Sequence, residues 1–241
     1  MRRLLVVLVF GLNLGTGTAR ADFSTIGSFI TNGGSQAIEL TNLGTSATLS
    51  TQSGGLPILF TYQGLAGLPA DLQGAQAAHL FLDLTTTEPA HAPPGLGLAI
   101  QPFTTLGTLT IERDTPAAEG FGDRRTLLAF TFTGTLLGSL GGQQLSLQAQ
   151  SLLNEVSASS DFLNVDGASL WSMSLSIGPV DPAVAIVDSF LSGFQAGSTG
   201  LFATTAPPVP VPCPPSLLLT IFGALSLAGM PLLRPRRLAM G

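Results

Sequence analysis

Strict alternation of apolar and polar side chains is the feature that most constrains the fold of this 241-residue chain. The stretch Trp171–Ile177 places four apolar side chains on one face and three serines on the other, as a half-buried strand requires. Residues 128–133 and 145–149 alternate in the same way. Weaker alternation predicts further strands at 37–43, 47–51, 58–62, 79–85, 96–100 and 108–113.

The breaks between these segments have turn chemistry. They contain Gly-Gly at 33–34, 54–55 and 141–142, Pro-Pro at 93–94 and Asp-Gly at 166–167. Because no long helical pattern separates the strands, the sequence predicts a mainly β fold, an antiparallel sandwich or jelly-roll-like domain over residues 22–205.

One segment of this domain departs from the alternation. Val184, Val187, Leu191 and Phe194 recur at helical spacing after Pro182. Residues 181–194 therefore fit either a short helix or a loop followed by a late strand.

The charge balance excludes one class of partner. All nine basic residues are arginines, and only Arg113, Arg124 and Arg125 lie between the two ends of the chain, whereas all fourteen acidic residues lie between Asp22 and Asp188. Nucleic-acid binding requires a basic patch to neutralise phosphates, so nucleic acid is not an expected partner.

Residues that could carry chemistry are few. Cys213 is the only cysteine, which excludes an internal disulfide and a cysteine-rich metal site. The sequence has no G-x-S-x-G motif and, lacking lysine, no phosphate-binding loop of the usual kind. We therefore predict no enzyme activity and no cofactor.

Three groups of side chains could still carry chemistry. His79, Asp83, Glu88 and His91 could supply some metal ligands, but exposed or hydrogen-bonded histidines are the more common case. The acids of residues 112–123 could form a glycosidase pair or a calcium site, although alternating charges in a loop usually mark a solvated surface. Residues 161–167 are only partly similar to a calcium loop, because Met173 stands where the closing glutamate belongs.

The N-terminus has the three parts of a signal peptide. Arg2 and Arg3 precede the apolar run 4–14, and Ala19 and Ala21 supply the small residues before a cleavage site. We predict a signal helix over residues 1–21, with cleavage after Ala21, and therefore export.

The C-terminus has three parts as well. Residues 206–215 contain six prolines and predict an extended spacer that cannot join a sheet as a central strand. Residues 216–233 carry no charge and reach about 27 Å as a helix, near the lower limit for a membrane span. Arg234, Arg236 and Arg237 follow in the tail 234–241 and are expected to stay in the cytoplasm.

This order of spacer, apolar span and arginine cluster resembles the PEP-CTERM sorting tail of bacterial proteins, a tail also labelled as an ice-binding protein C-terminal domain. Val209, Pro210, Val211 and Pro212 occupy the place of the sorting motif, with Val211 where the family has glutamate. The resemblance covers about the last 33 residues and implies recognition by an exosortase, a membrane transpeptidase. It also implies a surface or matrix protein associated with exopolysaccharide.

Three functional hypotheses follow. The first is an exported, membrane-anchored or sorted surface protein without catalytic activity, located at the cell envelope or, after processing, outside the cell. The second is an extracellular binding module for carbohydrate, cation or ice, which an exposed aromatic row or a flat threonine face would favour. The third is a divergent secreted hydrolase, which needs two carboxylates, or a histidine and an acid, converging in a cleft.

Overall fold

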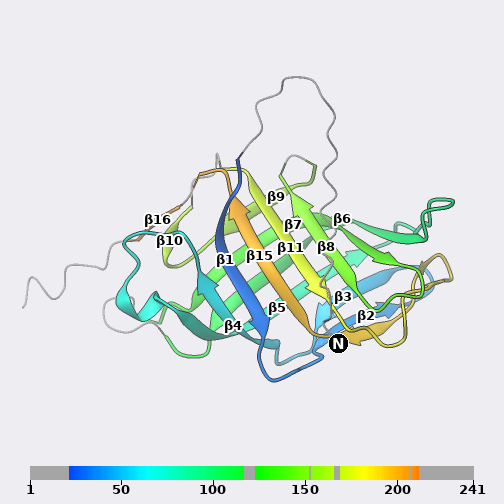
Figure 1. Ribbon diagram of the computed structural model, residues 1–241, viewed down its shortest axis with the longest axis horizontal. Coiled ribbons are helices and arrows are strands. Elements are labelled where there is room, and N and C mark those ends of the chain that lie inside the picture. Colours follow the sequence, from blue (N-terminus) through cyan, green and yellow to red (C-terminus); the bar gives the residue numbers. More distant parts are fainter. Residues whose placement is uncertain (1–21, 117–122, 152, 166–168, 207, 212–241) are drawn as a thin grey trace, which may run out of the picture.

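The computed structural model describes residues 22–116, 123–151, 153–165, 169–206 and 208–211 (Figure 1). The predicted signal helix, most of the spacer, the predicted membrane helix and the basic tail lie outside these residues. Among the described residues, no helix has the length and apolar character that crossing a membrane would require.

The described chain is built almost entirely of strands, with one 3-10 turn at Ala70–Leu72. The strands are β1 (Ser24–Thr31), β2 (Ile38–Asn42), β3 (Ala47–Thr51), β4 (Leu56–Tyr62), β5 (Ala75–Thr86), β6 (Leu98–Arg113), β7 (Thr126–Ser139), β8 (Leu145–Gln150), β9 (Val156–Ser159), β10 (Leu163–Asn164), β11 (Trp171–Ile177), β12 (Ile186–Val187), β13 (Phe190–Leu191), β14 (Phe194–Ala196), β15 (Ser198–Thr204) and β16 (Val209–Pro210).

Eight of these strands close into an antiparallel barrel. Their order is β5-β4-β1-β15-β11-β8-β7-β6, and β6 pairs again with β5. A side sheet of β3, β2 and β14 extends from the end of β5, and β9 pairs with the first half of β7. In Figure 1, β1, β15, β11 and β8 run side by side across the front.

The mainly β, antiparallel prediction is therefore confirmed, but the predicted sandwich or jelly roll is wrong. The reason lies in β5 and β6, which have 12 and 16 residues and are long enough to pair along both edges. By pairing with each other they join the two ends of the sheet, and closure leaves these strands without a free edge.

The predicted segments 96–100 and 108–113 belong to one strand, β6. The alternation fails between them because the register with β7 shifts between Phe103 and Gly107. At Gly107 a Cβ atom would lie 2.6 Å from the carbonyl oxygen of Asp83, so this crossing admits only glycine. The bulge bends β6 and lets it follow the barrel wall.

Of the two interpretations of residues 181–194, the structure has the loop with strands, and not the helix. Here β12 and β13 form a short hairpin, and its turn residues Asp188 and Ser189 have φ of 48° and 68°. Two positive φ values at the centre of a two-residue turn suit the twist of a hairpin. The helical spacing arises because Val184, Leu191 and Phe194 are buried from extended backbone.

Aromatic rings fill the barrel. The Phe130 and Phe202 rings stack with centroids 5.1 Å apart, and Trp171 meets Phe130 edge-on at 5.5 Å. Gly200 leaves room for the Phe29 ring and the Leu175 side chain, since a Cβ atom there would overlap that ring and lie 2.7 Å from a Leu175 methyl carbon. The described side chains thus form a packed core inside the barrel.

The first and last strands of the barrel are neighbours. Ser24 at the start of β1 lies opposite Thr204 at the end of β15, and Trp171 at the start of β11 also faces Thr204. The chain therefore enters and leaves the barrel at the same end, which we call the terminal end.

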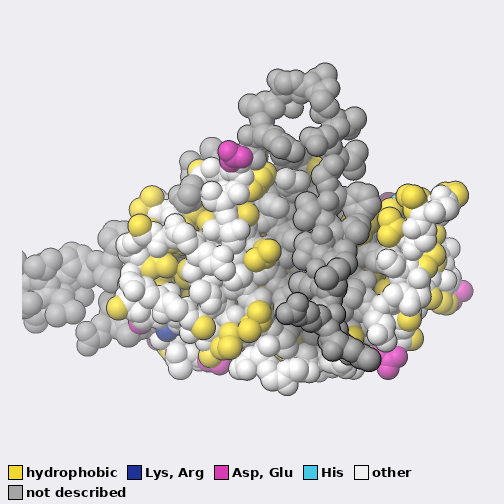
Figure 2. Space-filling model, in the orientation of Figure 1, with side chains coloured by type: hydrophobic (Ala, Val, Ile, Leu, Met, Phe, Trp, Pro, Cys, Tyr) yellow, Lys and Arg dark blue, Asp and Glu magenta, His cyan; other side chains and the backbone are white. Residues whose placement is uncertain are grey.

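Charge is unevenly distributed around the barrel. The five adjacent strands β4, β1, β15, β11 and β8 contain no Asp, Glu, Arg or His, and we call their outer surface the uncharged wall. In the part of this face that Figure 2 leaves in view, the few charged side chains lie toward the margins of the molecule. Glu39, His79, Asp83 and Glu112 lie instead on β2, β5 and β6.

Candidate functional site

Several of the charged side chains singled out in the sequence hold neighbouring segments of the chain together. His79 Nδ1 lies 2.8 Å from Asp114 Oδ1, and Arg113 Nη1 donates to Asp71 Oδ2 at 3.1 Å. The His79 and Asp114 side chains are 39% and 43% exposed. A histidine and an acid thus meet, but on the open surface and not in a cleft of the kind that a hydrolase needs.

The Asp161 carboxylate is used to bind backbone N–H groups of the same domain. Its Oδ2 accepts hydrogen bonds from the backbone N–H groups of Arg125 and Thr126 at 3.1 and 2.9 Å. These bonds hold the start of β7 beside the loop before β10. The carboxylate that would begin a calcium loop is therefore already satisfied by backbone donors, and Asp166 lies outside the described residues.

The two histidines do not converge. His79 lies opposite Glu112 near the end of β6, whereas His91 forms an isolated bridge with Ile100 near its beginning. Within the part of the chain that the structure describes, no three His, Cys, Asp or Glu side chains are grouped to hold a metal ion.

Half of the expected sorting motif is paired with the domain. Val209 lies opposite Asn164 and Pro210 opposite Leu163, and the Val211 N–H donates to the Phe162 carbonyl at 2.8 Å. The pair stands apart from the barrel sheet, as the proline content predicts. Ordered pairing thus extends beyond the domain boundary expected at residue 205.

The remaining expected site residues cannot be placed. Pro212, the signal residues Ala19 and Ala21, and the basic residues Arg234, Arg236 and Arg237 lie outside the described residues.

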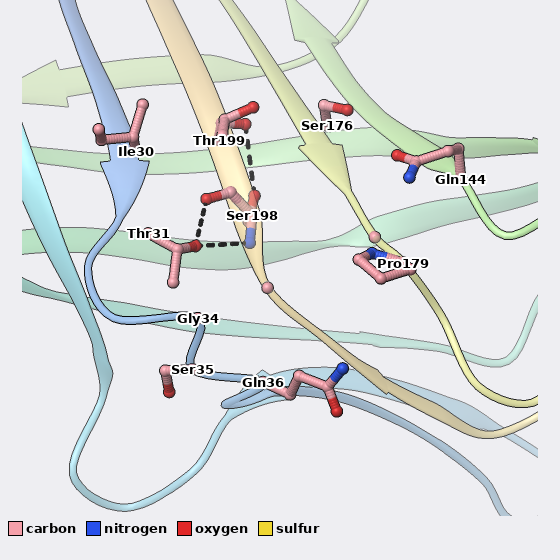
Figure 3. A pocket seen from close by; sticks show the side chains of 12 residues that line it. Ile30, Thr31, Gly34, Ser35, Gln36, Gln144, Ser176, Pro179, Ser198 and Thr199 are labelled. Atoms are coloured by element: carbon pink, nitrogen blue, oxygen red, sulfur yellow. Dashed lines mark hydrogen bonds between the residues drawn. The ribbon is translucent and has the colours of Figure 1, made fainter. Parts of the chain in front are cut away.

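An uncharged hollow lies at the end of the barrel opposite the terminal end (Figure 3). Its volume is about 420 Å³, and its polar lining side chains are hydroxyls and amides. At its centre Thr31 Oγ1 donates to the Ser198 carbonyl at 2.6 Å and accepts from the Ser198 N–H at 2.9 Å. These two bonds use the hydroxyl to join β1 to β15, so its central polar group is occupied by the protein itself.

A second hollow, of about 400 Å³, lies on the outer face of β3, β5 and β6. Its lining combines one aromatic ring, one carboxylate and several hydroxyls, and we call it the Phe81 hollow: Thr48, Ser50, Thr51, Gln52, Ser53, Phe81, Leu82, Asp83 and Thr108. The lining is thus mostly polar, with one aromatic ring among hydroxyls, an amide and a carboxylate.

The Phe81 ring packs against the backbone of Gly55. A Cβ atom at Gly55, whose φ is 72°, would lie 2.9 Å from a ring carbon of Phe81, so the ring rests directly on the glycine backbone. Phe81 is half-buried and Asp83 is exposed. A fixed ring with one accessible part can stack on a ligand without first losing side-chain freedom.

The sequence alone does not identify this hollow. In the sequence, Asp83 stands out only as a weak candidate metal ligand, and residues 79–85 only as a predicted strand. An available signal was the outward position of Phe81 between His79 and Asp83 on β5, where the alternation requires a solvent-facing side chain. A large aromatic residue in a polar face is the kind of exception that marks a surface site.

Comparison of this chain with protein-family models, with curated proteins and with solved structures gives no match.

Proposed function

We propose that this chain is an exported protein of the cell envelope, sorted to or held at the cell surface by its C-terminal segment. Its barrel domain acts there without catalysis. The support from sequence is the charge order at both ends and the resemblance of the tail to a PEP-CTERM sorting signal.

The observation that carries this proposal is the meeting of both chain ends at the terminal end of the barrel. Ser24 follows the predicted cleavage site by three residues, and Thr204, opposite it, precedes the spacer. A domain tethered there presents its opposite end and its outer faces to the surroundings. This arrangement suits a surface module whose contacts are made away from the anchor.

The test is a C-terminal deletion in the native host, followed by cell fractionation and intact-mass measurement. Deletion of residues 212–241 leaves β16 and its pairing in place and is expected to release the protein from the membrane fraction. The mature protein is expected to begin at Asp22. Full membrane retention of this deletion would contradict the anchor.

Substitution of Arg234, Arg236 and Arg237 by serine is the matched control for the span. It preserves the apolar length but removes the charges that fix orientation.

A product cut near residues 209–215 in the wild type would support processing by a transpeptidase, whereas a membrane-bound product that retains Arg237 would refute it.

The second candidate function is an extracellular binding module. The Phe81 hollow favours it, because it offers an apolar ring, hydroxyls and a carboxylate on one exposed face. Binding of any soluble saccharide by the purified protein, lost on Phe81→Ala, would support this function.

A further inference from the structure

The Phe81 hollow is part of a longer polar row that crosses the sheet. Strand pairing places five outward side chains directly opposite one another on β2, β3, β5, β6 and β7: Glu39, Ser50, Asp83, Thr108 and Thr131. Neighbouring strands lie about 4.8 Å apart, so this row extends over roughly 19 Å. Such a row can contact several units of an extended polymer, and not only one.

The row carries negative charge without a counterion from the protein. Glu39 and Asp83 lie two strands apart, about 10 Å. Neither carboxylate forms an ion pair with a described residue. The three described arginines are engaged elsewhere: Arg113 pairs with Asp71, Arg124 donates to the backbone carbonyl of Asp161, and Arg125 donates to that of Asp114. A ligand for this face is therefore expected to bring positive charge of its own.

The Phe81 ring sets a second requirement for the ligand. Phe81 lies next to Asp83 on the same face of β5 and lines the same hollow. An aromatic face attracts apolar C–H surface and also cations placed above the ring. Ser50 and Thr108, opposite Asp83 on its two sides, supply hydroxyls that can both donate and accept hydrogen bonds.

From these features we propose that the Phe81 hollow binds an amino-bearing glycan, a polysaccharide whose sugars carry protonated amines. The apolar face of one sugar packs on Phe81, its ammonium group approaches Asp83, and its hydroxyls contact Ser50 and Thr108. Glu39 attracts the amine of a neighbouring sugar. This inference rests on the second proposed function, saccharide binding, and does not depend on membrane anchoring.

The shape of the hollow sets the expected strength. It is shallow and open, so one sugar gains little, and affinity comes from repeated units along the row. Exposed charge pairs are screened by salt, so binding is expected to weaken as ionic strength rises.

The test is titration calorimetry of the full chain, solubilised in a neutral detergent, with two saccharides of equal length. A glucosamine hexasaccharide carries amines, and its N-acetylated counterpart has the same backbone without charge. We expect the amine form to bind at least about tenfold more tightly at low salt, because the acetylated form has no attraction to the carboxylates.

Two variants and two controls locate the binding. Phe81→Ala and Asp83→Asn should each weaken binding of the amine form by about threefold or more. Asp188→Asn removes an exposed acid in the β12–β13 turn, and Leu201→Ala removes an exposed side chain on the uncharged wall; neither should change it. Asp83→Asn is exposed and does not endanger folding, so it keeps the test valid if Phe81→Ala unfolds.

The outcomes separate the two proposals. Equal binding of both saccharides, lost on Phe81→Ala, would overturn the amine requirement but leave a binding module. Binding of the amine form that is unchanged in Asp83→Asn would place the site elsewhere. If neither saccharide binds, the amino-glycan inference is wrong; if other soluble saccharides also fail to bind, the binding function is wrong as well.

Discussion

Tyr62 is expected to make the stability of this domain depend on alkaline pH. Its hydroxyl is buried and donates to the Leu127 carbonyl at 2.7 Å. Burial raises the pKa of Tyr62 well above its ordinary value, and the nearby Ser160 hydroxyl and Arg113 charge oppose that rise only in part. The folded domain therefore holds this proton to a higher pH than the unfolded chain does.

The sign and size of this pH effect on stability follow from the linkage between proton binding and folding. The stabilisation is complete below the unfolded pKa of about 10 and is lost as pH rises above it, by about 1.4 kcal/mol per pH unit. At about pH 11 the loss is about 1.4 kcal/mol, and at about pH 11.5 it is about 2 kcal/mol. Such a loss is a large part of the stability of an ordinary domain.

The chain is well suited to this measurement. Tyr62 is its only tyrosine, and residues 22–211 contain no lysine and no cysteine. In a domain of these residues, Tyr62 is the only side chain whose ordinary pKa lies between about 9 and 12. Denaturant unfolding at several pH values gives the free energy, and absorbance near 295 nm reports tyrosinate directly.

The matched control is Tyr62→Phe. It loses one hydrogen bond, which costs about 1 kcal/mol at neutral pH, while the Leu127 carbonyl keeps the hydroxyl of Ser160 at 2.6 Å. Its stability should then stay flat across the alkaline range. An equal decline in both proteins, or tyrosinate forming in the folded domain near pH 10, would refute the reasoning.

Three further changes test the packing of the domain by denaturant unfolding. Gln101→Leu should lower the free energy of unfolding by about 2–4 kcal/mol. The fully buried Gln101 side chain accepts a hydrogen bond from the Leu191 N–H at 3.3 Å and donates one to the Glu88 carbonyl, and leucine can do neither. Substitution of the exposed Gln148 by leucine, the control, should change the free energy of unfolding very little. Gly200→Ala should cost about 1–3 kcal/mol by overpacking, and an unchanged midpoint would contradict the close approach described above. Asp161→Ala should cost about 1–3 kcal/mol through two unsatisfied N–H groups, and Asp161→Asn, which keeps one acceptor oxygen, should recover part of it.

The sequence predicts the strands of this fold better than their partners. The segments Trp171–Ile177 and Ala47–Thr51 agree with β11 and β3 because alternating burial is a local property, visible in each strand alone. Closure is not local, since it depends on β5 meeting β6 along a second edge. Strand β1 was missed because Gly27 leaves a gap in the apolar side, one that the Phe60 ring fills from a neighbouring strand.

The candidate site was hard to predict for a similar reason. Phe81 and Asp83 are two residues apart in the sequence, but Ser50 and Thr108 come from strands before and after β5. Only strand register brings these four side chains to one hollow. By contrast, the two chain ends could be interpreted from sequence alone, because charge order and proline content need no partner.

The pairing of β16 with β10 has a mechanical consequence. A force applied through the C-terminal segment meets this two-residue pair before it reaches β15. Rupture of the pair and of the Val211–Phe162 bond would release residues 206–211, about 20 Å of extended chain, because Thr205 stays bonded to Leu170. The load would then fall on β15, which is held along its length by ladders to β1 and β11, and must shear both at once. We therefore expect the β16–β10 pair to open under load before the strands of the barrel do.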